Sequence, residues 1–131
     1  MATELELAAV ICALVFGGES EVRHDYIAAG RSHHVRVDCE TDSHVIEVGL
    51  DDRRSSFDSL HQAIFAAELT GKIPVVIIVD TNSVEESVEY QIETTARWAG
   101  VNFLTVQKDF VIRLQMTSYL RNGPVPNLFG M

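Results

Sequence analysis

The sequence predicts a single α/β domain built around a mixed β-sheet, with the order helix, three strands, helix, strand, helix, strand. Three observations lead to this fold class. Apolar and polar residues alternate on both sides of a turn between 33 and 50, which is typical of antiparallel strands. A nearly continuous apolar run at 73–79 fits a strand that is covered on both faces. Capping residues and stop glycines mark three helices around these strands.

The first helix is predicted at 3–16. Its start carries a capping box formed by Thr3 and Glu6, in which each residue satisfies the other's free backbone amide. Gly17 and Gly18 end the helix. A first strand at 21–28 follows.

Two strands at 33–40 and 44–50 form the most informative part of the sequence. Their register follows from the apolar residues expected on the buried face, which are Val35, Val37, Ile46 and Val48. Pairing 37 with 48 and 39 with 46 satisfies this pattern and places the turn between Asp42 and Ser43. The same register sets Asp38 directly opposite Glu47, with their Cβ atoms about 5 Å apart.

The second helix is predicted at 55–70, with Ser55 and Asp58 as its capping box and Gly71 as its stop. The apolar strand at 73–79 follows it, and Pro74 fits because it lies at the beginning of that strand.

The third helix is predicted at 83–99, capped by Ser83 with Glu86 and followed by a strand at 101–106. Alternating apolar residues at 110–116 favour a sixth strand over a helix. The domain is taken as 1–131, with an irregular tail at about 122–131.

Ten basic and nineteen acidic residues give the 131-residue chain a net charge of −9. Such a surface disfavours the binding of nucleic acid unless a cation or a local basic patch intervenes. An unknown protein partner is the alternative. The longest apolar run, 7–16, is shorter than the roughly 20 residues of a membrane span, and acidic rather than basic residues flank it. We therefore expect no membrane association and a cytoplasmic protein, in which Cys12 and Cys39 are free thiols.

Two facing carboxylates repel each other unless a proton or a cation lies between them. A Mg²⁺ ion, which takes oxygen ligands at about 2.1 Å, could bridge Asp38 and Glu47. Arg36 could instead neutralise the pair, or all these residues could form the solvated face of an antiparallel sheet. The sequence leaves these alternatives open.

The order of elements, with an aspartate in the second strand and a glutamate in the third, resembles the PD-(D/E)XK nuclease superfamily. The stretch that carries the resemblance reads His34-Val-Arg-Val-Asp38 and then His44-Val-Ile-Glu47-Val-Gly49. The resemblance covers about residues 3–106. It implies a restriction-endonuclease-like three-layer sandwich with the order αβββαβαβ.

The resemblance also implies the roles of individual residues. Asp38 and Glu47 would hold a divalent metal, and Gln62 would be a further catalytic residue of the kind found in RecB-like members. A glutamate of the first helix, Glu4 or Glu6, would join them. Gly49 stands where the family carries a lysine that activates the attacking water, so the catalytic motif is incomplete.

Four other residues could replace the missing lysine, namely Arg53, Arg54, Lys72 and Lys108. We expect a structural or partner-binding protein with little or no activity. A Mg²⁺-dependent phosphodiesterase acting on DNA or RNA, or an unrelated α/β binding module, is the alternative. A Gly49→Lys substitution is expected to place an amine beside Glu47, if the backbone there does not require a positive φ.

Overall fold

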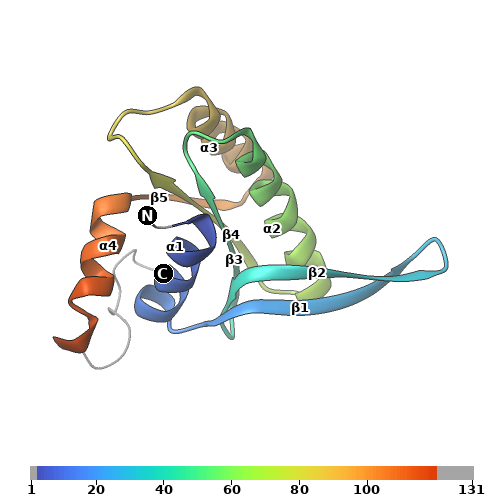
Figure 1. Ribbon diagram of the computed structural model, residues 1–131. Coiled ribbons are helices and arrows are strands. Elements are labelled where there is room, and N and C mark those ends of the chain that lie inside the picture. The colour runs from blue at the N-terminus through green and yellow to red at the C-terminus, as the bar shows by residue number, and fades with distance from the viewer. Residues whose placement is uncertain (1–2, 121–131) are drawn as a thin grey trace.

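The computed structural model describes residues 3–120, so the predicted tail at 122–131 lies outside the described part of the chain. Figure 1 shows the arrangement of the elements. In chain order they are α1 (Glu4–Ile11), a π-helical segment (Cys12–Phe16), β1 (Glu19–Ala28), β2 (Arg31–Glu40), β3 (His44–Leu50), a 3₁₀ turn (Arg54–Ser56), α2 (Phe57–Thr70), β4 (Ile73–Asp80), α3 (Ser87–Ala99), β5 (Asn102–Gln107), α4 (Lys108–Met116) and a second 3₁₀ turn (Ser118–Leu120).

The five strands form one mixed sheet in the order β1-β2-β3-β4-β5. The pairs β1–β2 and β2–β3 are antiparallel, while β3–β4 and β4–β5 are parallel. The predicted α/β class with a mixed sheet is therefore confirmed. The apolar run at 73–79 becomes β4, which pairs with a parallel strand on either side.

Helices cover both faces of the sheet (Figure 1). On one face, α1 and α4 pack on alternate residues of β3 and β4, such as Val48 and Ile77. On the other face, α2 and α3 pack on the intervening residues of β4, such as Val76 and Ile78. Within residues 3–120, no helix has the length and apolar character needed to cross a membrane.

The predicted sixth strand at 110–116 is wrong, because this segment forms helix α4. Its buried residues are Val111 and Leu114, whose spacing of three suits one face of a helix packed against the core of α1. Met116, which belonged to the alternating pattern, is 69% exposed.

Two of the three predicted helix starts are also wrong. Ser55 lies in the 3₁₀ turn before α2, and α3 begins four residues after Ser83. Ser83 has a φ of 62°, in the left-handed region, and its N–H donates to Oδ1 of Asp80. Its hydroxyl donates to Oε1 of Gln107, so Ser83 belongs to the loop after β4 and does not cap the helix. The start at Thr3 is confirmed, because its hydroxyl accepts a hydrogen bond from the Glu6 N–H.

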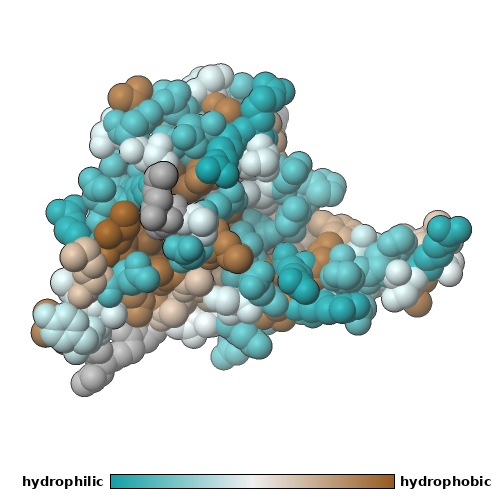
Figure 2. Space-filling view, viewed as in Figure 1, coloured by the Kyte–Doolittle hydropathy of each residue, from teal (hydrophilic) through white to brown (hydrophobic). Residues whose placement is uncertain are grey.

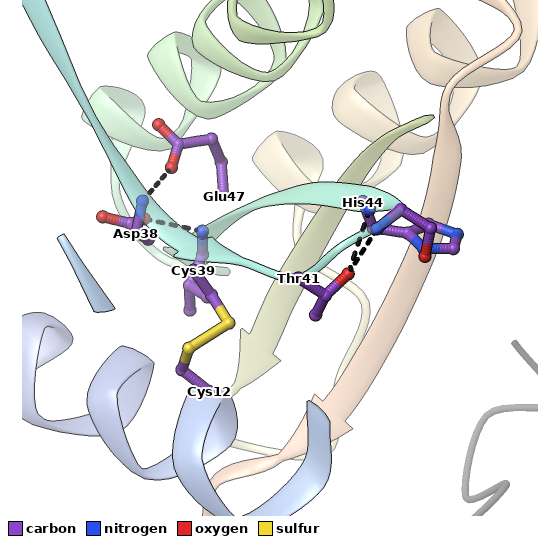
Figure 3. Close-up of a disulfide and its surroundings, with 8 residues drawn as sticks. Cys12, Asp38, Cys39, Thr41, His44 and Glu47 are labelled. Atoms are coloured by element: carbon purple, nitrogen blue, oxygen red, sulfur yellow. Dashed lines mark hydrogen bonds between the residues drawn. A yellow bond between two sulfur atoms is a disulfide. The ribbon is translucent and has the colours of Figure 1, made fainter. Parts of the chain in front are cut away.

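The prediction of free thiols is wrong, because Cys12 and Cys39 form a disulfide (Figure 3). Cys12 follows α1, and Cys39 points from β2 into the same buried cluster, with a Cα–Cα distance of 5.4 Å. The bond ties the first helical segment to the sheet across 27 residues of sequence. Disulfides persist mainly in oxidising compartments, so this bond bears against the cytoplasmic location, which stays a prediction.

We expect reduction of this disulfide to lower the free energy of unfolding by about 2–4 kcal/mol, because it releases a long loop in the unfolded chain. Urea unfolding of the wild-type protein with and without a phosphine reductant measures the difference. A Cys12→Ala/Cys39→Ala variant should be insensitive to the reductant. Equal unfolding midpoints for oxidised and reduced wild type would contradict the expectation.

Candidate functional site

Strands β2 and β3 separate at Asp38 and Glu47. Nearer the turn, the strands pair through Cys39 with Ile46 and Glu40 with Val45, so the predicted register is confirmed there. Beyond this point side chains replace the ladder. The Asp38 N–H donates to Oε2 of Glu47, and the Val48 N–H donates to Oδ2 of Asp38, each over 2.8 Å (Figure 3). Each carboxylate thus bonds to the backbone of the opposite strand.

The separation divides the predicted buried face of the hairpin. Val37 packs with Val45 and Ala66 beneath α2, whereas Ile46 and Val48 pack on the α1 face. The predicted pairing of Val37 with Val48 and the shared face of Val35, Val37, Ile46 and Val48 are therefore wrong. The physical reason is a change of direction in β2.

That change of direction is also visible in the pairing of β1 with β2. Their ladder omits the pair formed by Glu21 and Asp38, and Glu21 has a φ of 52°. A positive φ at a residue other than glycine is uncommon and bends the strand away from regular pairing. Asp38 therefore lies at a break in both of its neighbouring ladders.

Burial raises the pKa of Glu47 to about 9, and the negative charge of Asp38 adds to the effect. The Glu47 side chain is only 2% exposed. Burial also raises the pKa of Asp38. Two adjacent carboxyl groups in such a place cannot both carry a charge, so we expect the pair to hold one proton at neutral pH.

Asp38 is the more accessible member of the pair. It lines a pocket of about 250 Å³ with Glu4, Leu5 and Ala8 of α1. Burial and the charge of Asp38 raise the pKa of Glu4, and the charge of Glu4 in turn raises the pKa of Glu47. Of the two glutamates expected from the first helix, Glu4 therefore acts on the pair. Glu6 lines an adjacent pocket with Asp38.

Gly49 faces Ser56 of the 3₁₀ turn and Ser59 of α2 at very short range. A Cβ atom at this position would lie 2.7 Å from Oγ of Ser56 and 3.1 Å from Oγ of Ser59. Gly49 is not among the residues with positive φ, so the constraint is space rather than backbone conformation. The expectation that Gly49→Lys would simply place an amine beside Glu47 is wrong, because Ser56 and Ser59 fill that volume.

The four basic residues that could replace the lysine lie in different places. The charge of Arg53 lowers the pKa of Glu4, so the Arg53 guanidinium lies within electrostatic reach of this carboxylate. Arg54 lies over the ring of Phe57, and Lys72 binds Oε2 of Glu40 over 2.7 Å. Lys108 begins α4. Arg53 is thus the best placed of the four.

Gln62 and Arg36 belong to a neighbouring pocket. Gln62 is exposed on α2 and lines this pocket together with Arg36 and His34. Within residues 3–120, no hydrogen bond joins Gln62 to Asp38 or Glu47, and no ion pair joins Arg36 to either carboxylate. The proposed neutralisation of the pair by Arg36 is not observed.

A second acidic cluster lies at the carboxyl ends of β3 and β4, and Asp51 and Glu89 are the members that the sequence reading did not identify. Asp51 is fully buried, and its Oδ1 accepts a hydrogen bond from Thr81. Burial raises the pKa of Asp51 and raises that of Glu89 to about 7, with Asp80 contributing to both. The signal was available, because Asp51 and Asp80 each directly follow the apolar residues of a parallel strand.

Within residues 3–120, no group of three or more His, Cys, Asp or Glu side chains is arranged to hold a metal ion. Any cation at Asp38 and Glu47 would therefore take most of its ligands from water. No protein-family model, curated protein or solved structure matches the chain.

The raised pKa of Glu47 predicts how stability depends on pH. Between the ordinary value of 4.5 and about 9, the folded protein binds one proton more at Glu47 than the unfolded chain does. This contribution makes the free energy of unfolding fall as pH rises, by up to about 1.4 kcal/mol per pH unit. A Glu47→Gln variant offers an amide oxygen as acceptor for the Asp38 N–H but does not titrate. It should therefore lose this pH-dependent contribution to the free energy of unfolding.

We therefore expect Glu47→Gln to gain stability relative to wild type as pH rises from about 5 to about 8. Urea unfolding over this pH range measures the difference. Glu68→Gln, which removes an exposed carboxylate of α2, is the matched control and should follow wild type. A difference between Glu47→Gln and wild type that stays constant with pH would contradict the assignment.

Proposed function

We propose that this chain is a PD-(D/E)XK-like domain with an incomplete catalytic set, which binds a divalent cation weakly and turns over phosphodiesters slowly or not at all. The observation that supports this proposal most directly is the site at Asp38 and Glu47. Two carboxyl groups meet where neighbouring strands separate, and a third, Glu4, acts on them. The mixed sheet with helices on both faces is compatible with a restriction-endonuclease-like fold.

The residues present fit a weakly held Mg²⁺ or Mn²⁺ ion. Mg²⁺ is commonly bound by one or two carboxylates and several water molecules, so Asp38 and Glu47 supply a sufficient protein contribution. When bound, such an ion lowers the pKa of a coordinated water and polarises a phosphate. The proton held by the pair competes with the cation, which makes weak binding the expected behaviour.

The missing element is a group that orients water and accepts its proton. A positioned acid-base residue typically contributes about 10²–10⁴-fold to the rate. Gly49 cannot supply one, and Ser56 and Ser59 occupy the volume beside it. This absence is the reason for proposing a structural or partner-binding role.

One observation favours the alternative of a working Mg²⁺-dependent phosphodiesterase. Arg53 lies close enough to Glu4 to lower its pKa, so a cationic side chain is present at the edge of the site. A guanidinium can stabilise the charge of a phosphate, although it is a poor proton shuttle. If the chain is active, Arg53 is the residue we expect to support that activity.

We expect wild-type protein to bind Mg²⁺ and Mn²⁺ weakly, because two carboxylates supply few protein ligands and a proton competes for them. Asp38→Asn should abolish binding, and it should stabilise the cation-free protein because it removes a negative charge from a largely buried position beside Glu47. Isothermal titration calorimetry measures the first effect and urea unfolding the second. Asp58→Asn removes an exposed carboxylate and is the control; equal binding by both variants would refute the site.

We expect no measurable cleavage of single- or double-stranded DNA by wild-type protein with Mg²⁺ or Mn²⁺. The reason is the absence of an acid-base residue at Gly49. A gel assay with labelled substrates checks this expectation, with Glu47→Gln as the control for contaminating nuclease. Robust cutting by wild type that is lost in both Glu47→Gln and Arg53→Ala would replace the non-catalytic proposal with the enzymatic alternative.

A further inference from the structure

Strands β1 and β2 continue beyond the sheet as a two-stranded arm, which we define as residues 22–37. The arm begins where β2 leaves β3, because these two strands pair only at Cys39 and Glu40. Figure 1 shows it extending away from the body of the domain. The arm keeps regular antiparallel pairing from Val22 with Val37 to Ala28 with Arg31.

The arm reverses the charge of the rest of the chain. It carries three of the ten basic residues and one of the nineteen acidic ones, and three of the five histidines. Its net charge is therefore +2, against −11 for the remaining residues, with histidines counted as neutral. Figure 2 shows that the surface of the arm is largely hydrophilic. This segment is a local basic patch on an acidic protein.

Two of the three arginines of the arm are available for a ligand. Arg23 forms an ion pair with Asp25 over 2.9 Å. Arg31 and Arg36 are exposed, and within residues 3–120 neither makes an ion pair or a side-chain hydrogen bond. Unpaired, exposed guanidinium groups are strong partners for phosphate.

Four aromatic rings contact one another in series, two from the arm and two from helix α2. The rings of His33 and Tyr26 stack with centroids 5.4 Å apart, and Tyr26 meets Phe65 edge-on at 4.9 Å. His61 continues the series, nearly parallel to Phe65 at 6.5 Å. Rings from two separate elements thus form one continuous surface.

A pocket of about 660 Å³ lies between the arm and α2. This volume falls in the range of small-molecule sites. Its wall combines three of the four rings with cationic and amide groups. The lining residues are Tyr26, His34, Val35, Arg36, His61, Gln62 and Phe65.

We propose that the arm and this pocket bind single-stranded nucleic acid. The guanidinium groups of Arg31 and Arg36 would contact phosphates, and the ring-lined pocket would receive an unstacked base, whose edge Gln62 and His34 can reach with hydrogen bonds. Aromatic surfaces beside a cationic strand are the usual means of binding single strands, because every base offers a π-face. A duplex keeps its bases stacked inside, which leaves the pocket without an occupant.

This inference goes beyond the proposed function and does not depend on it. The arm residues are separate from the carboxylates, and binding needs no cation at Asp38 or Glu47. The net charge of −9 does not oppose this binding, because the positive charge is concentrated on one projecting element.

The test is fluorescence anisotropy with labelled oligothymidine of about 15 nucleotides, a length within the usual single-strand site sizes. It is run at low salt with a chelator, so failure of the cation site cannot affect it. We expect wild-type protein to bind, Arg36→Ser to weaken binding about tenfold, and its logarithmic salt slope to fall by about 0.7 per lost phosphate contact. Arg113→Ser removes an exposed arginine of α4, and this control should bind like wild type.

A second variant tests the rings. Phe65→Leu keeps an apolar side chain on α2 but removes the central ring, and we expect about tenfold weaker binding with an unchanged salt slope. Circular dichroism and the unfolding midpoint establish that each variant is folded. No binding by wild type, equal loss in Arg36→Ser and Arg113→Ser, or preference for a duplex of the same length would each overturn the proposal. Equal binding of an acidic peptide would do so as well, because it would indicate an unspecific anion surface or a protein partner.

Discussion

The reciprocal hydrogen bonds of Asp38 and Glu47 are the constraint on which the rest of the molecule depends. Each carboxyl group accepts a hydrogen bond from a backbone N–H that a regular ladder would have paired with a carbonyl. The two strands can therefore separate without leaving those buried amides unsatisfied, a loss that costs about 1–3 kcal/mol for each group. The separation frees β2 to continue with β1 as the arm, and it places the two acidic side chains together.

The disulfide and the bend at Glu21 lie immediately beside this separation. Cys39 follows Asp38 in β2, and its bond to Cys12 fixes that end of the strand against the α1 segment. Glu21, opposite Asp38, takes the positive φ that allows β1 to follow the change of direction. A carboxyl pair, a covalent bond and a bent strand thus occupy one small region, which supports the view that its geometry is closely defined.

Sequence patterns predicted the parts of the fold in which local and tertiary preferences agree. The register around Cys39 and Ile46 follows from alternation and turn residues, and β4 follows from its apolar run. The patterns failed where tertiary contacts decide. Ser83 has a helix-capping residue type but is held by Asp80 instead, and residues 110–116 alternate yet form a helix because Val111 and Leu114 meet α1.

Site prediction from the sequence shows the same division. Asp38 and Glu47 were brought together by strand register alone, whereas the facing of Cys12 and Cys39 depends on how α1 packs on the sheet. The proximity of Glu4 and Arg53 likewise depends on tertiary packing, since 49 positions separate them in the sequence. Gln62 lies on the predicted helix, but the sequence could not show that it lines the pocket beside Arg36.

The contact between Gly49 and Ser56 limits which substitutions position 49 can accept. Any side chain at position 49 would collide with Ser56, whose hydroxyl also donates to the carbonyl of Leu50 at the end of β3. A mutation that introduces a basic residue there would be deleterious until Ser56 had changed, and a change at Ser56 alone would lose that hydrogen bond. The two positions are therefore coupled, so acquiring a lysine at position 49 would require passage through a less stable intermediate.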